Sequence, residues 1–246
     1  MNALEPASPQ GKTRWDRFLY WADRFYRAEE FERFERNYKL EIAVNLQAAK
    51  SAVFANDATW VDALNHAITA KPNNLTNWRA TQPFVAWCRS EPESAMLAFR
   101  MLWNEDLAVS ARMDRFAEIV TTSGKKILIA ETSFFHMAID PYAFPMHRAT
   151  PVERAMDLTG YPEPKEVGIK PGELGGRYDH FLKFLDIMLK RATERDIPFR
   201  DRLDAQSAMW MVTMWHPLVG WSEADKQAFL AYQGEAKLRK ESWPSL

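Results

Sequence analysis

Apolar side chains recur every three or four residues along most of this chain, and this spacing limits its possible folds more than any other feature. A period of about 3.6 residues is typical of an α-helix with one buried face. In the segment from Phe31 to Leu46, Glu and Arg are expected to fill the face that points to solvent. The first two predicted stripes are Trp15, Phe18, Leu19, Ala22, Phe25 and Tyr26, then Phe31, Phe34, Tyr38, Ile42 and Leu46.

The residue composition favours the same fold class. The 246 residues include nine glycines against ten tryptophans and fifteen phenylalanines, which favours helices packed through large rings over a turn-rich sheet protein. Residues 125–140 suit a strand or a helix; a helix is favoured because no second strand of comparable quality could pair with it. The sequence therefore predicts an all-α protein, an irregular multi-helix bundle of about eight to ten helices.

Helix starts and boundaries follow from local signals. Three pairs have the spacing of a capping box, namely Ser90 with Glu93, Thr150 with Glu153, and Ser222 with Asp225. Residues 161–176 hold three prolines and four glycines and form the clearest loop. The expected organisation is a flexible tail over 1–13, an N-terminal helical lobe over 14–160, the loop over 161–176, a C-terminal helical lobe over 177–240 packed on the first, and a tail over 241–246.

Charge and hydropathy argue against several classes of protein. The 32 basic and 33 acidic residues give a net charge of −1, which makes DNA binding less expected without excluding it, since dedicated DNA-binding proteins carry a basic excess. The longest apolar runs fall far short of the roughly 20 residues of a membrane helix. A single cysteine, Cys88, and the lack of a signal peptide predict a cytoplasmic protein.

No catalytic or metal-binding motif is present in the sequence. Gly11-Lys12-Thr13 has the ending of a phosphate-binding loop, but Pro6 stands where that loop needs a glycine. Cys88 beside Trp87 is interpreted as a packed core thiol. We therefore predict no catalytic residue, no metal and no cofactor. The five histidines, at 66, 136, 147, 180 and 216, show none of the spacings of a zinc site.

Three polar segments are candidate binding sites. In the proline-rich connector between Pro141 and Thr150, His147 and Arg148 precede a helix N-terminus, where Arg148 with Arg154 could hold a phosphate or carboxylate. The alternative is that Arg148 bonds neighbouring carbonyls or acidic side chains. Tyr142 lies in the same connector. Trp78 and Arg79 suit base stacking or a protein contact, unless Trp78 is buried.

The third candidate segment is "RDRLDAQS", residues 200–207. Asp201 and Asp204 are expected to cap the following helix and to interact favourably with its dipole. The alternative is a polar contact site, with Arg202, Asp204 and Gln206, that faces a ligand or the connector.

Three stretches together resemble the region that precedes the ATPase module in McrB-type AAA+ proteins of bacterial type IV restriction and anti-phage systems. They are "NNLTNWRATQPFVAWC", "FFHMAIDPYAFPMHRATPVERAMDLTGYP" and "RDRLDAQSAMWMV". The resemblance implies a recognition or adaptor role, with modified or phage DNA as a ligand and an AAA+ ATPase or nuclease as a partner. The ATPase module itself is absent from this sequence.

These observations lead to two main hypotheses. The first is a non-catalytic recognition module that senses nucleic acid, in which Arg148, Arg154 and Arg202 contact phosphates while Trp78 or Tyr142 stacks on a base. The second is an adaptor that binds a partner subunit or phage protein without touching nucleic acid. A small enzyme ranks last, because no paired nucleophile and base can be named.

Overall fold

The computed structural model describes residues 13–76 and 78–236, without the side chains of residues 78–80. This part of the chain contains no strand, which confirms the predicted all-α class. Its helices are α1 (Arg14–Tyr26), the π-helical segment η1 (Phe31–Arg36), α2 (Asn37–Ala55), α3 (Trp60–Thr69), α4 (Trp78–Ser90), α5 (Pro92–Leu102), α6 (Val109–Thr122), α7 (Ile129–His136), α8 (Ala149–Thr159), the 3-10 segment η2 (Pro164–Val167), α9 (Leu174–Thr193), α10 (Arg202–Met214) and α11 (Glu223–Gly234).

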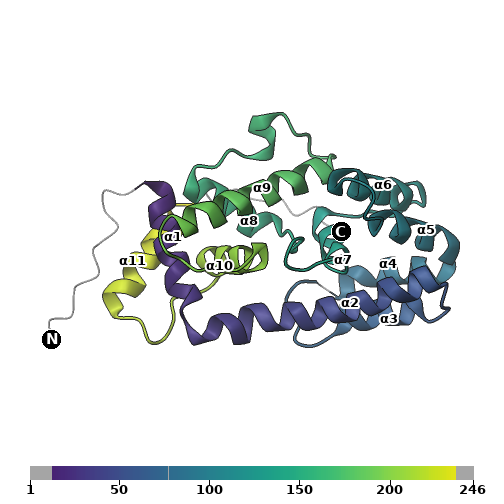
Figure 1. Cartoon of the computed structure of the whole chain (residues 1–246), viewed down its shortest axis with the longest axis horizontal. Helices are drawn as coiled ribbons and strands as arrows, with labels where there is room; N and C mark the ends of the chain where they lie inside the picture. Colours follow the sequence, from purple (N-terminus) through teal and green to yellow (C-terminus); the bar gives the residue numbers. More distant parts are fainter. Residues whose placement is uncertain (1–12, 77, 237–246) are drawn as a thin grey trace.

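The described helices form an elongated body, in which α1, α10 and α11 lie towards one end and α3 to α6 towards the other (Figure 1). Helices α2 and α9 run between these ends. Helix α2 packs on α3 and α5, and η1, which leads into it, packs on α10; α9 packs on both α6 and α10. The predicted division into two lobes stays a prediction.

Large rings fill the interior at both ends. Near α11, the Trp21 and Phe25 rings each lie 5.2 Å from Phe229. Among α4 to α7, the Phe99 and Phe135 ring centres are also 5.2 Å apart. Edge-to-face and offset contacts of this kind stabilise a core beyond the burial of area alone.

Two predicted helix starts are wrong. Ser90 ends α4 and donates a hydrogen bond to the Trp87 carbonyl, so α5 begins at Pro92 with Glu91 in the N-cap position and no side-chain cap. Helix α8 begins at Ala149 with Arg148 in the N-cap position, which places Thr150 inside its first turn.

Two other helix starts follow the sequence signals. Ser222 caps α11 by accepting the Asp225 N–H at 3.1 Å. Asp201 caps α10 by accepting the Asp204 N–H at 2.9 Å. Each cap satisfies an amide that the helix itself leaves without an acceptor.

The π-helical segment η1 changes the predicted inner face of the chain. Phe34, expected in the buried stripe, is 47% exposed, whereas Glu35 and Arg36, expected outside, are buried. A π turn holds more residues than an α turn, so the 3.6-residue spacing does not apply there. The expected outer face therefore enters the interior at this point.

Residues 125–140 form a helix as favoured, although only Ile129–His136 is helical. The loop over 161–176 is present, with η2 inside it and the first turn of α9 at its end. None of the described helices is both long and apolar enough to span a bilayer. Gly11-Lys12 lies outside the described residues.

Candidate functional site

The connector between α7 and α8 is held from both sides by arginines of other elements. The Arg36 guanidinium lies 5.4 Å from the centre of the Tyr142 ring, which is 45% exposed. Arg202 donates from Nη1 to the Ala143 carbonyl at 3.0 Å and pairs through Nε and Nη2 with both oxygens of Asp186, at 2.6 and 2.7 Å. Arg202 therefore fixes the connector to α9 instead of presenting its charge to solvent.

Arg148 makes the internal contacts that were the alternative to an anion site. Its Nη1 donates to the carbonyls of Asn74 and Leu75, at 3.1 and 2.9 Å. Its guanidinium lies 5.3 Å from the centre of the Trp210 ring. These contacts tie the start of α8 to the loop before α4 and to α10.

Arg154 and His147 are also turned towards the protein. Arg154 donates from Nη2 to the Gln233 carbonyl at 3.2 Å, and burial lowers its pKa. The His147 ring is 4% exposed and packs edge-on against Phe181, and burial lowers its pKa to about 3. Arg148 and Arg154 thus bind separate elements, and these contacts agree with the alternative in which Arg148 bonds neighbouring carbonyls.

Asp204 belongs to a buried network of charges under η1. It is fully buried and accepts hydrogen bonds from Arg36, from the Arg200 side chain and backbone, and from the Tyr26 hydroxyl at 3.3 Å. Asp201, besides capping α10, pairs with Arg36 at 2.7 Å. The predicted cap role holds for Asp201, whereas the Asp204 carboxylate pairs with the buried Arg36 and the exposed Arg200.

Gln206 extends this network to a buried lysine. Lys39, 1% exposed, donates from Nζ to Glu35 Oε1 at 2.5 Å, to Gln206 Oε1 at 2.8 Å and to Ser207 Oγ at 2.9 Å. All three hydrogen-bonding positions of the ammonium are used. Burial raises the pKa of Glu35 and lowers that of Lys39, while the attraction between the two charges opposes both shifts.

Trp78 and Arg79 lie at the start of α4. Their side chains are outside the described part of the structure, so the stacking role assigned to them stays a prediction. Cys88 is fully buried, and burial raises the pKa of its thiol to about 12, in keeping with a packed core thiol. In the described ranges, no three His, Cys, Asp or Glu side chains are grouped as a metal site would need.

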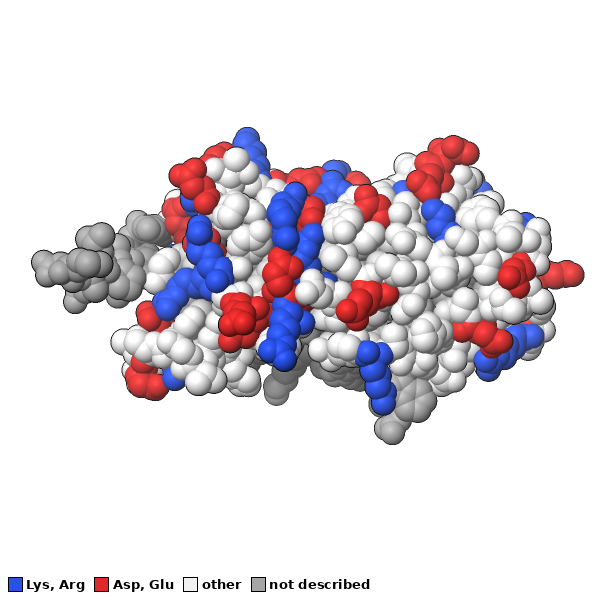
Figure 2. Space-filling view, turned by 60° about the horizontal axis from the view of Figure 1, so that its bottom comes forward, with Lys and Arg blue, Asp and Glu red and all other residues white. Residues whose placement is uncertain are grey.

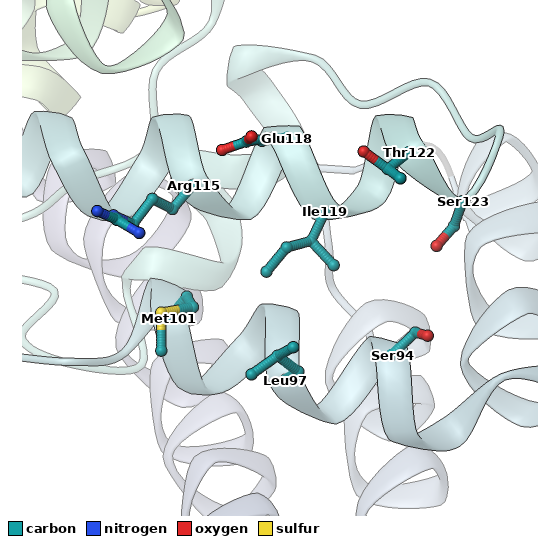
Figure 3. A pocket seen from close by; sticks show the side chains of 8 residues that line it. All are labelled: Ser94, Leu97, Met101, Arg115, Glu118, Ile119, Thr122 and Ser123. Carbon is teal, nitrogen blue, oxygen red and sulfur yellow. The ribbon is translucent and has the colours of Figure 1, made fainter.

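A groove of about 420 Å³ opens between α5 and α6, and its apolar side chains point into the space between the two helices (Figure 3). Leu97, 51% exposed, and Met101 come from α5 and face Ile119 of α6. Hydroxyl groups stand at one end and Arg115 at the other. The lining residues are Ser94, Leu97, Met101, Arg115, Glu118, Ile119, Thr122 and Ser123.

Sequence reasoning missed the buried charges and this groove. Glu35 and Lys39 are four residues apart and have the spacing of a surface pair on a helix. One buried charge could have been recognised from the sequence. Arg112 lies four residues before Phe116 and eight before Val120, so it falls on the buried stripe of α6. An arginine at such a position marks either a neutralised charge or a binding site.

No protein-family model matches this chain, and neither curated proteins nor solved structures gave a match. The resemblance to the pre-ATPase region of McrB-type proteins therefore stays a prediction.

Proposed function

We propose that this protein is a non-catalytic adaptor that binds a partner protein through the α5–α6 groove. The observation that carries the proposal is an apolar floor, formed by the exposed Leu97 with the half-buried Met101 and Ile119 and bounded by polar ends. A partner helix with apolar side chains three or four residues apart would fill such a groove. Burying an exposed leucine contributes about 1.5–3 kcal/mol to association before the costs of ordering.

The groove is lined by two charged side chains, Arg115 and Glu118. Arg115 is exposed and makes no ion pair with any described residue, so an acidic side chain at one end of the partner helix would be complementary to it. The resemblance noted above suggests the class of partner, namely a ring ATPase or a nuclease encoded nearby. A role in bacterial defence rests on that resemblance alone.

The nucleic-acid hypothesis has less support from the side-chain contacts. Arg148, Arg154 and Arg202 each donate to carbonyl groups of the protein, and Arg202 is also paired with Asp186. On the face drawn in Figure 2, basic and acidic side chains alternate in a band across the middle. Binding of a phosphate backbone depends on several uncompensated cations acting together.

The test is co-expression of the chain with the products of its neighbouring reading frames, followed by affinity measurement on the purified complex. We expect Leu97→Glu to weaken binding at least tenfold. The matched control is Leu230→Glu on α11, since Leu230 is similarly exposed at 47% and lies outside the groove. Equal affinity for both variants would remove the groove from the proposal.

Duplex DNA, plain and cytosine-methylated, is tested in parallel at two salt concentrations. Little binding is expected. A gel shift that weakens steeply with salt, by roughly one unit of log–log slope per phosphate contacted, would favour the nucleic-acid hypothesis instead. Arg148→Glu would then show whether the connector is the site of contact.

A further inference from the structure

Two equally buried arginines of this protein differ in whether an acceptor neutralises them. Arg36 and Arg112 are each 4% exposed. Arg36 is neutralised by Asp201, at 2.7 Å, and by Asp204. Arg112 makes no hydrogen bond and no ion pair within residues 13–76 and 78–236, and its Nε is buried without an acceptor. Buried guanidinium groups are ordinarily paired, so the lack of an acceptor at Arg112 needs an explanation.

Partly buried arginines elsewhere in the chain underline the difference. Arg100 and Arg154 also have a buried Nε without an acceptor. Arg100 nevertheless donates from Nη2 to Asn56 Oδ1 at 2.6 Å, and Arg154 donates from Nη2 to the Gln233 carbonyl at 3.2 Å. Arg112 has no such bond, so the whole fork of its guanidinium donors remains available.

A second buried polar side chain without a partner packs on the same aromatic ring as Arg112. His136 is fully buried, and neither ring nitrogen has a hydrogen-bond partner. Its ring stacks on Phe144 with centres 4.8 Å apart, and the Arg112 guanidinium lies 5.4 Å from the centre of the same Phe144 ring. The Tyr178 hydroxyl donates to the Pro145 carbonyl, and the centre of its ring lies 5.8 Å from the centre of the His136 ring.

At this corner a buried guanidinium lies near a neutral imidazole. Burial, with the charges of Arg112 and Lys50, lowers the pKa of His136 to about 3, so the imidazole is neutral and offers one N–H donor. Burial also lowers the pKa of Arg112, while the nearby Glu105 carboxylate opposes that shift. Lys50 is paired with Glu105 at 2.6 Å, and the exposed fractions of their side chains are 22% and 61%.

We propose that Arg112 and His136 form a recessed binding site for a small oxyanion, either a phosphate or a carboxylate group, walled by Phe144 and Tyr178. Arg112 offers a planar fork that matches two oxygens of such a group, and His136, on the same Phe144 ring, offers an N–H donor. The site is independent of the α5–α6 groove, whose lining residues do not include either side chain.

The test uses inorganic phosphate and acetate titrated separately into the full-length protein at pH 7 and constant ionic strength. Binding is followed by calorimetry and by the imidazole NMR signals of His136. A saturable shift of these signals with one anion or both is expected, and the comparison identifies the preferred group. The absence of a saturable shift with either anion overturns the proposal.

Variants separate a specific site from a general effect of salt. Arg112→Gln should raise the dissociation constant at least tenfold, and it should fold because it removes an unpaired buried charge. Arg33→Gln, at an exposed arginine of η1, should bind as the wild type does. If Arg112→Gln binds with wild-type affinity, the site is refuted; the wild-type His136 signals remain decisive should that variant not fold.

Discussion

Replacement of Lys39 by methionine tests how the buried charges under η1 contribute to stability. The substitution keeps most of the side-chain volume but leaves Glu35, 2% exposed, without its counter-charge. Removing one partner of a buried ion pair costs about 3–5 kcal/mol. Gln206 and Ser207 also lose their donor. We therefore expect Lys39→Met to lower the free energy of unfolding by about 4 kcal/mol at pH 7.5.

The effect should depend on pH in a defined direction. Burial already holds the pKa of Glu35 above its ordinary value, and loss of the Lys39 charge removes an influence that lowers it. A carboxyl group whose pKa is higher in the folded state than in the unfolded state lowers the stability of the fold once the pH exceeds its pKa in the unfolded state. Lys39→Met should therefore be less destabilising at pH 5.5 than at pH 7.5, because Glu35 can become neutral.

Urea unfolding followed by circular dichroism at 222 nm measures these changes, provided that the slope with denaturant stays constant. A double-mutant cycle with Glu35→Gln should give a coupling energy above about 2 kcal/mol. Lys50→Met is the control, since Lys50 pairs with the exposed Glu105 and its loss should cost less than about 1 kcal/mol. A coupling energy within about 0.5 kcal/mol of zero would refute the reasoning.

Two further predictions concern buried histidines and a close helix contact. Burial lowers the pKa of His136 and of His147 from 6.5 to about 3, so the unfolded state binds protons first and stability falls as the pH drops below 6.5. Each histidine should lower the free energy of unfolding by about 1.4 kcal/mol at pH 5.5. The His136→Gln, His147→Gln double variant should therefore show a flatter pH profile in urea unfolding. Gly175→Ala should lower the free energy of unfolding by about 1–3 kcal/mol, because a Cβ there would lie 2.1 Å from the Ser110 carbonyl oxygen. Gly172→Ala is the control and should leave stability unchanged, because no atom lies within 4 Å of a Cβ at that position. Similar melting curves for both variants would contradict this prediction.

The fold class could be predicted because it depends on the periodicity of apolar residues. Residues 14–26 kept one 3.6-residue register, and α1 forms there with Trp15, Phe18 and Phe25 buried. At Phe34 the same reasoning failed, because a single π turn changes which side chains face inward, and the residue pattern carries no mark of that turn. Local spacing therefore predicts helices well and predicts poorly which face of an irregular turn is buried.

The candidate sites were harder to predict, because a charged residue gives no indication of its partner. Arg148 and Arg112 are chemically alike in the sequence. Their difference lies in what the fold brings to them: two carbonyls, from Asn74 and Leu75, reach Arg148, and no acceptor in the described part reaches Arg112. Those carbonyls are more than 70 residues away in the chain, so no local pattern could have supplied them.

The connector that joins α7 to α8 is therefore a fixed corner of the fold. Arg202 approaches its backbone from α10, and Arg112 approaches its Phe144 ring from α6. Because Arg202 already pairs with Asp186 and donates to the Ala143 carbonyl, a phosphate that binds Arg202 would have to break these bonds. At Arg112 no bond to a described residue would be broken, so a ligand there gains a charged hydrogen bond without displacing one. An anion should accordingly select Arg112 over the more exposed Arg148 and Arg202.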